Sequence, residues 1–290
     1  MYAIIGIINL ILILVPIVPY VLILKILYRD KDSRGGSYKI MFHLGIADCI
    51  QLICFTPSWL CHLMDEASFP FALNKFFGAL LNAGWVNYVH FTLLLSINRL
   101  VILFFGQRAE IFFNEMGLTV TLIALWLSAC VLAAAYLTPV LNVIYEPENL
   151  AWNYSGENPY VTVADKISII LSLIEIALTF AIYVVIVCLL CYHGRTFANS
   201  TTRHRHVYWN RGRDLIILLQ AALISGFATF NIVYWQVYNN LFPNSLWANY
   251  GSSLTWIVNC GVNPAIYLTI NRPIRRKIFA AFRPQRLSSG

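Results

Sequence analysis

Long apolar stretches alternate with short polar segments along this 290-residue chain. A helix needs about 20 apolar residues to cross the roughly 30 Å hydrocarbon core of a bilayer. Seven stretches reach that length, near residues 3–28, 39–64, 74–105, 117–141, 164–192, 214–240 and 246–271. The pattern predicts an all-α membrane protein with a seven-helix transmembrane bundle over residues 1–271 and a cytoplasmic helix and tail over residues 272–290.

Positive charge is divided unevenly among the connecting segments, and this division predicts the orientation. Of the 20 Lys and Arg residues, only Lys75 and Lys166 belong to connections on one side. The other 18 lie in or beside the first, third and fifth connections and the tail. Because Lys and Arg in short loops are retained in the cytoplasm, we expect an extracellular N-terminus and a cytoplasmic C-terminus.

Composition leaves no room for a separate soluble domain, since hydrophobic residues make up 59% of the chain and charged residues 11%. The net charge of +7 is dispersed over the cytoplasmic connections, so we predict contact with the lipid bilayer and no nucleic-acid partner. All seven cysteines fall within apolar spans, where buried thiols usually act as small hydrophobic side chains. The sequence predicts no metal site and no cofactor.

Two Asn-X-Ser/Thr sequons are present, and the expected topology separates them. Asn153-Tyr154-Ser155 lies in the longest outer connection, residues 142–163, whereas Asn199-Ser200-Thr201 lies in a basic inner connection. Only the outer sequon should meet the glycosylation machinery. We therefore predict a single glycan, at Asn153.

Residues 272–282 follow the last span and combine cations with an apolar stripe. Ile274, Ile278 and Phe282 recur at helical spacing, with Pro273 in the first turn. This pattern predicts a short amphipathic helix on the inner membrane surface, although a simple basic tail is the alternative.

Several polar residues lie inside the apolar spans, where an unpaired polar group is costly. Asp48 is in the middle of the second span. In the seventh span Asn259 and Asn263 share one helical face, and Pro264 leaves a backbone carbonyl free. These residues are expected to face the bundle interior, either as a functional polar core or simply as contacts between helices.

A set of short motifs occurs in a fixed order along the spans. Arg99 at the inner end of the third span could by itself merely extend its guanidinium to the interface. It is accompanied by Asp48, by Trp126 in the fourth span and by Asn263-Pro264-Ala265-Ile266-Tyr267 before the basic helix. Together they resemble rhodopsin-like G-protein-coupled receptors. The segments Met41 to Asp48, Ile97 to Arg99 and Asn263 to Arg275 are most similar to the nematode serpentine chemoreceptors, with the class T branch as the best match.

The resemblance implies roles for individual residues. Arg99 would bind the G protein on activation, and Asn98 occupies the acidic position before it. Asp48, Asn259 and Asn263 would belong to the polar core that can hold sodium, with Pro264 and Tyr267 acting in activation. Besides Asn98, this chain departs from the family pattern in three further places. Tyr88 replaces a small hydroxyl residue near that core, Asn74 replaces a disulfide cysteine, and the sixth span lacks the usual Trp and Pro.

A ligand pocket is expected on the outer half of the bundle. Leu81, Trp85 and Tyr88 share a helical stripe with Arg99, which under the family pattern lines the ligand cavity. Glu175 in the fifth span could pair with a ligand or with another helix. Aromatic stripes also pack against neighbouring helices, so that alternative stays open. Most of the aromatic residues near the outer ends of spans six and seven are interpreted as an interfacial belt; the residues concerned are Tyr234, Trp235, Tyr238, Trp247 and Tyr250.

The leading hypothesis is a chemosensory receptor without enzymatic activity that binds a small extracellular molecule and signals to a heterotrimeric G protein. The resemblance implies the plasma membrane, including that of sensory cilia. The alternative is a solute transporter or ion channel in which Asp48, Glu175 and His90 form an ion path. The absence of an internal repeat argues against a transporter of the inverted-repeat type.

Overall fold

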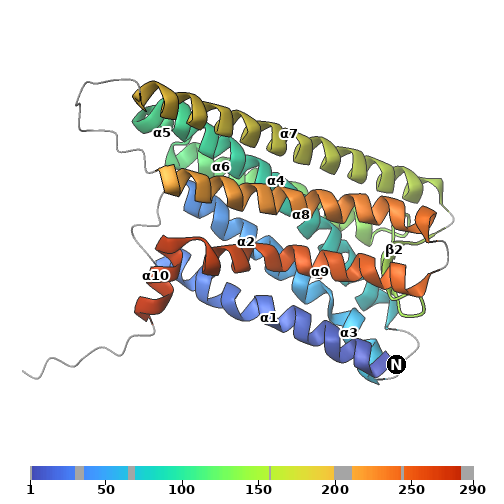
Figure 1. Cartoon of the computed structure of the whole chain (residues 1–290). Helices are drawn as coiled ribbons and strands as arrows, with labels where there is room; N and C mark the ends of the chain where they lie inside the picture. Colours follow the sequence, from blue (N-terminus) through green and yellow to red (C-terminus); the bar gives the residue numbers. More distant parts are fainter. Residues whose placement is uncertain are drawn as a thin grey trace, which may run out of the picture.

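The computed structural model describes residues 2–29, 36–64, 69–156, 158–198, 211–242 and 245–281. Its long helices run side by side in one elongated bundle (Figure 1). The helices that correspond to the predicted spans are α1 (Tyr2–Arg29), α2 (Gly36–Cys54) with α3 (Thr56–Met64), α4 (Phe71–Phe105), α6 (Glu115–Leu137), α7 (Pro159–Ala198), α8 (Arg211–Leu241) and α9 (Leu246–Thr269). The expected seven-helix bundle is therefore confirmed.

Five segments are long and apolar enough to cross a membrane by length and composition, within the residues that the structure describes. They are Tyr2–Arg29, Gly36–Met64, Phe71–Phe105, Glu115–Leu137 and Pro159–Tyr192. The α8 and α9 helices, of 31 and 24 residues, are more polar but pack in the same bundle. In α9 the polar side chains of Ser252, Ser253, Asn259 and Asn263 are buried, so they face other helices rather than lipid.

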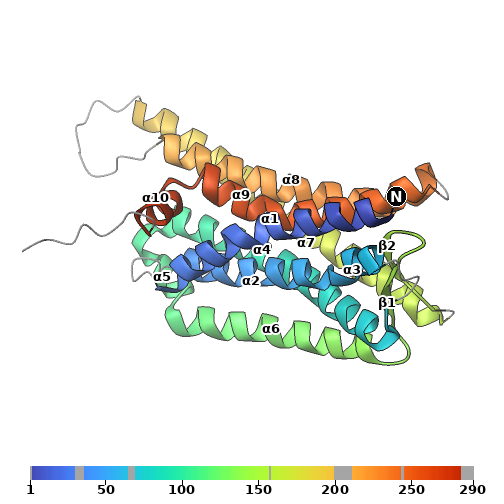
Figure 2. The ribbon, with the colours of Figure 1, turned by 90° about the horizontal axis from the view of Figure 1, so that it is seen from below.

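The outward surface of the bundle is apolar, as a lipid environment requires. Along α1, for example, Ile4, Ile11 and Val18 are exposed while Ile13 and Ile23 are buried. The main core joins α1, α2, α4 and α9, and α6 lies on the flank beyond α2 and α4 (Figure 2).

The second expected span, residues 39–64, is interrupted at Phe55, where α2 ends and α3 begins. Pro57 has no backbone N–H and cannot donate to the Ile53 carbonyl four residues earlier. The Thr56 hydroxyl donates to that carbonyl instead, at 2.6 Å. The helix breaks here because the Thr56 hydroxyl takes the place of the backbone N–H that Pro57 lacks.

The longest outer connection contains a β-hairpin that the sequence pattern did not predict. Strand β1 (Val143–Glu146) pairs antiparallel with β2 (Ala151–Tyr154) in the register Val143 to Tyr154. In the turn, Leu150 adopts φ 55°, a conformation rare for a leucine. Its side chain is completely buried and its carbonyl accepts a hydrogen bond from the Ser253 hydroxyl at 3.0 Å, so packing against α9 holds the turn.

At the other end of the bundle, a short 3-10 turn, η2 (Gly106–Arg108), and α5 (Ala109–Phe112) link α4 to α6, and α10 (Arg272–Ala281) follows α9. The N-terminus lies at the hairpin end and α10 at the opposite end (Figure 1). Ile274 and Ile278 are buried while Phe279 is exposed, which confirms the amphipathic helix. Phe282 and the rest of the tail lie outside the described residues, as does the Asn199 sequon.

Candidate functional site

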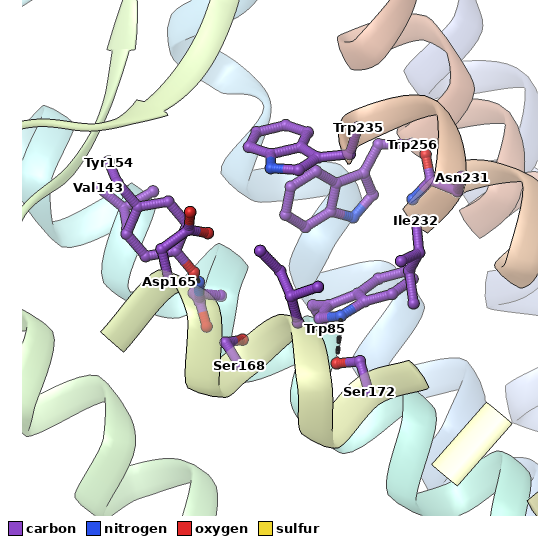
Figure 3. Close-up of a pocket in the computed structure, with 12 residues that line it drawn as sticks. Trp85, Val143, Tyr154, Asp165, Ser168, Ser172, Asn231, Ile232, Trp235 and Trp256 are labelled. Carbon is purple, nitrogen blue, oxygen red and sulfur yellow. Dashed lines mark hydrogen bonds between the residues drawn. The ribbon is translucent and has the colours of Figure 1, made fainter. Parts of the chain in front are cut away.

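A pocket opens at the hairpin end of the bundle between α4, α7, α8, α9 and the two strands (Figure 3). Its volume is about 520 Å³, counting the open space at its mouth. The lining residues are Asn82, Trp85, Val143, Tyr154, Asp165, Ser168, Ile169, Ser172, Asn231, Ile232, Trp235 and Trp256.

Three tryptophans from three helices form the aromatic wall of the pocket. The Trp256 ring lies edge-on to Trp85 and to Trp235, with ring centroids 5.6 Å apart in both pairs. The Trp85 indole N–H donates to Ser172 Oγ at 3.1 Å, and the Trp256 indole N–H donates to Gln51 Oε1 at 2.8 Å. These contacts fix the orientation of two of the rings before any ligand binds.

Trp256 also connects the pocket with the polar core deeper in the bundle. Its partner Gln51 is fully buried in α2 and lies one helical turn from Asp48. A ligand that displaces the Trp256 ring would therefore disturb the helix that carries Asp48. The sixth span lacks the Trp and Pro of the common activation switch, and the Trp256–Gln51 contact is a different connection between the pocket and the polar core.

The hairpin covers the pocket and is attached to α4 without a disulfide. The Asn74 side chain donates to the Tyr145 carbonyl and accepts from the Tyr145 backbone N–H, both at 2.8 Å. One turn further along α4, Gly78 has no side chain and lets β1 approach closely, because a Cβ there would overlap the Val143 carbonyl. Asn74 thus makes the attachment that a cysteine makes in the family pattern.

Two tyrosines of the hairpin, Tyr145 and Tyr154, form further hydrogen bonds at this end of the bundle. The Tyr145 hydroxyl forms a hydrogen bond with His62 Nε2 at 2.9 Å, and burial raises the pKa of the Tyr145 phenol above its usual value. The Tyr154 hydroxyl accepts from the Asn82 side chain, and burial likewise raises the pKa of Tyr154. Both tyrosine side chains stay neutral and form hydrogen bonds between the hairpin and the helices that it covers.

The expected polar core is assembled by three helices. Asp48 of α2 accepts hydrogen bonds from Asn263 Nδ2 of α9 at 2.8 Å and from the Tyr20 hydroxyl of α1. All three residues are completely buried. The side chains of Asn259, Tyr88 and Tyr267 are also buried there, with polar atoms that have no hydrogen-bond partner among the described residues. Tyr20 is absent from the sequence prediction of this core, and it lies in an otherwise apolar first span.

At the end of α4 that lies nearest α5, Arg99 and the residue before it have separate partners. Asn98 is buried and accepts a hydrogen bond from the Ser37 hydroxyl at the start of α2. Arg99 Nη1 donates to the Tyr183 hydroxyl of α7 at 3.4 Å, a long and therefore weak bond. Asn98 does not restrain the arginine, and Tyr183 is the residue that sequence reasoning missed.

The structure places only Trp85 of the four expected ligand residues on the pocket. Leu81 is completely buried in the main core, and Tyr88 stacks on Trp85 at 5.5 Å on the side of the polar core. Tyr88 thus lies deeper in the bundle than the pocket, whereas Leu81 packs in the main core instead of facing the pocket. Glu175 is likewise absent from the pocket lining because it pairs with His90 at 3.3 Å.

The His90–Glu175 pair also bears on the proposed ion path. These two residues do meet between α4 and α7, whereas Asp48 is bound to Tyr20 and Asn263 instead. The structure therefore brings together two of the three residues, and it gives no contact from that pair to Asp48.

The interpretation of the outer aromatic residues as an interfacial belt is wrong for three of the five. Trp235 lines the pocket, Tyr238 is 3% exposed, and the buried Tyr250 hydroxyl donates to Asn9 Oδ1 at 2.9 Å. Trp247, by contrast, is 60% exposed at the end of α9. Helix spacing alone could not separate the inward rings from the outward ones, because this end of the bundle is aromatic on several faces.

The fold defines a multi-pass membrane protein of the seven-helix class. The structure is similar to the crystal structure of squid rhodopsin, with a TM-score of 0.81 over 97% of this chain and 85% of that one. The sequence identity of 15% means that this similarity shows the fold alone.

The sequence identifies the family more narrowly. Residues 2–289 match the family of serpentine type seven-transmembrane G-protein-coupled chemoreceptors called Srt, and the chain belongs to it. No protein with a curated function matches the sequence. The chain is thus a G-protein-coupled chemosensory receptor by its family.

Proposed function

We propose that this receptor binds a small extracellular molecule in the pocket beneath the hairpin and couples to a heterotrimeric G protein around Arg99. The observation that carries the proposal is the pocket itself, which four helices and the hairpin enclose. Trp85 on the pocket and Arg99 lie on the same helix, 14 positions and about 21 Å apart at 1.5 Å per residue. The ligand and the G protein would therefore share α4 while occupying opposite ends of the bundle.

In the proposed mechanism, the ligand favours one of two helix arrangements that already exchange in its absence. Asp48, Asn259, Asn263, Pro264 and Tyr267 would form the region that rearranges between the pocket and the inner end. Their buried polar atoms support this role, since a polar core with unpaired groups can gain hydrogen bonds when helices shift.

The test of this proposal is the effect of guanine nucleotide on ligand affinity in membranes. Because a G protein and an agonist stabilise the same arrangement, a non-hydrolysable GTP analogue should lower agonist affinity. The alternative of a transporter or channel predicts ligand-evoked current or uptake in cells that lack G proteins. Nucleotide-insensitive affinity together with such a current would replace the receptor mechanism.

We also propose that the hairpin end faces the outside of the plasma membrane, including that of sensory cilia, and that α10 lies on the cytoplasmic side. The distribution of Lys and Arg supports this orientation. The apolar stripe of α10, with Ile274 and Ile278 buried, suits a helix that lies along the inner membrane surface.

Asn153 provides a check on the orientation. It lies in β2, is partly exposed, and its side chain donates to Glu146 Oε2 at 2.7 Å. We expect an N-glycosidase to increase the electrophoretic mobility of the wild-type protein but not of Asn153→Gln or Ser155→Ala. A mobility shift that persists in both variants would contradict the topology, because it would place a second sequon outside.

A further inference from the structure

Among the described residues that line the pocket, the buried side-chain atoms without a hydrogen-bond partner are all acceptors. Three lining residues carry a buried side-chain oxygen without a partner: Asn82 Oδ1, Asp165 Oδ1 and Asn231 Oδ1. Leaving such an acceptor unpaired costs about 1–3 kcal/mol, more where it is charged. A ligand that supplies donors to these oxygens would recover that free energy.

Three hydrogen-bond donors around the same pocket are already used. The indole N–H groups of Trp85 and Trp256 donate to Ser172 and Gln51, and the Asn82 amide donates to Tyr154. A carboxylate ligand would find these three donors engaged and would lie close to the unpaired oxygens. The pocket is complementary to a molecule that donates.

The charge of the lining also favours a ligand that donates hydrogen bonds. Asp165 is the acidic lining residue, and no lysine or arginine is among the described residues that line the pocket. The next residue along α7, Lys166, is exposed and is not part of the lining. A cation in the pocket would gain a carboxylate partner, and the positive side chain that acts on this carboxylate, Lys166, lies outside the lining.

The opposite side of the pocket is aromatic. Figure 3 shows Asp165 and Tyr154 on one side and Trp85, Trp235 and Trp256 on the other. Indole faces attract cations, and the same rings accommodate apolar groups. One site thus offers a carboxylate, two amide oxygens and a tryptophan wall.

We propose that the ligand of this pocket is a small organic cation, a protonated amine on a compact apolar skeleton. The amine donates to Asp165 and Asn82, and the skeleton packs against the tryptophans on the side of the pocket where Asn231 lies. This inference rests on the proposed function, which makes this pocket the ligand site. It replaces Glu175, which His90 already engages, with Asp165 as the acidic contact.

The test uses probe sets that share a skeleton and differ in charge. The phenylethyl, isoamyl and indolylethyl skeletons are each supplied as the amine, the alcohol and the corresponding carboxylic acid. Binding is measured as the increase in Tm of the purified full-length receptor, and signalling as the second-messenger response in cells. The amines should raise Tm, and their alcohols and acids should not. Asp165→Asn should lower amine potency at least about tenfold, as expected on removing one partner of a buried ion pair.

Lys166→Gln is the matched control, because it changes the charge of the adjacent exposed residue and should leave amine potency within about twofold. Alcohols or acids that bind as tightly as their amines, or an amine set that does not bind at all, would overturn the inference. The wild-type comparison decides the matter even where Asp165→Asn does not fold. Amines that raise Tm without any nucleotide-sensitive or second-messenger effect would contradict the proposed G-protein coupling but not the ligand class.

Discussion

Replacing Arg99 with alanine is expected to abolish the ligand-dependent second-messenger response while the receptor still reaches the cell surface. The side chain is half-buried, and its hydrogen bond to the Tyr183 hydroxyl is 3.4 Å long. Such a weak contact contributes little to stability, so its loss should not unfold the bundle. The guanidinium is nevertheless the cation that the proposed coupling presents to the G protein.

Two measurements separate lost coupling from lost folding. Surface labelling and ligand-induced stabilisation of the purified protein should be the same for Arg99→Ala and the wild type. Tyr183→Phe is the matched control, since it removes the partner of Arg99 and keeps the arginine available; it should retain the ligand response. An unaltered response in Arg99→Ala would mean that the G protein binds elsewhere.

The transmembrane helices could be predicted from the sequence because lipid imposes a strong constraint. Every helix that crosses hydrocarbon must satisfy its backbone internally and present apolar side chains, so the pattern is visible over 20 residues or more. Local interruptions carry weaker signals. Thr56-Pro57 does mark the break between α2 and α3, but Pro16 and Pro19 lie within α1 without ending it. Proline alone therefore could not locate the break.

The pocket could be predicted only in part, because it depends on how distant elements meet. Trp85 was found through its helical register with Arg99. Trp235, Trp256 and Asp165 belong to other helices, and their part in the lining depends on the rotation of α7, α8 and α9 about their axes. The covering hairpin has strands of only four residues each, too short for a reliable alternating pattern.

The sequence shows that the disulfide cysteine of the family pattern is absent, but it does not show which contact takes the place of the disulfide. Asn74 has both a donor and an acceptor in its side chain, which matches the backbone N–H and carbonyl of Tyr145. Nothing in the sequence indicates that these two residues, 71 positions apart, are adjacent. The attachment also needs β1 to lie against α4. This close approach is possible because Gly78, one helical turn after Asn74, has no side chain.

Replacing Gly78 with alanine is expected to displace the hairpin and destabilise the receptor. The added Cβ would overlap the Val143 carbonyl oxygen and come within 2.7 Å of the carbonyl carbon and 3.1 Å of the Trp152 ring. A rigid backbone cannot move aside as a flexible side chain does, so β1 must shift away from α4. Overpacking of this kind costs about 1–3 kcal/mol, and the shift also strains the hydrogen bonds of Asn74.

Gly226→Ala is the matched control, because a Cβ at that helical position meets no atom within 4 Å. In the middle of a helix, alanine is favoured over glycine by about 0.5–1 kcal/mol, so this variant should keep or raise the Tm of the detergent-purified receptor. Gly78→Ala should lower that Tm and weaken ligand binding together, since Val143 lines the pocket. If Gly78→Ala instead matched Gly226→Ala in both measurements, β1 could not lie against α4 as described, and the pocket would lack its cover.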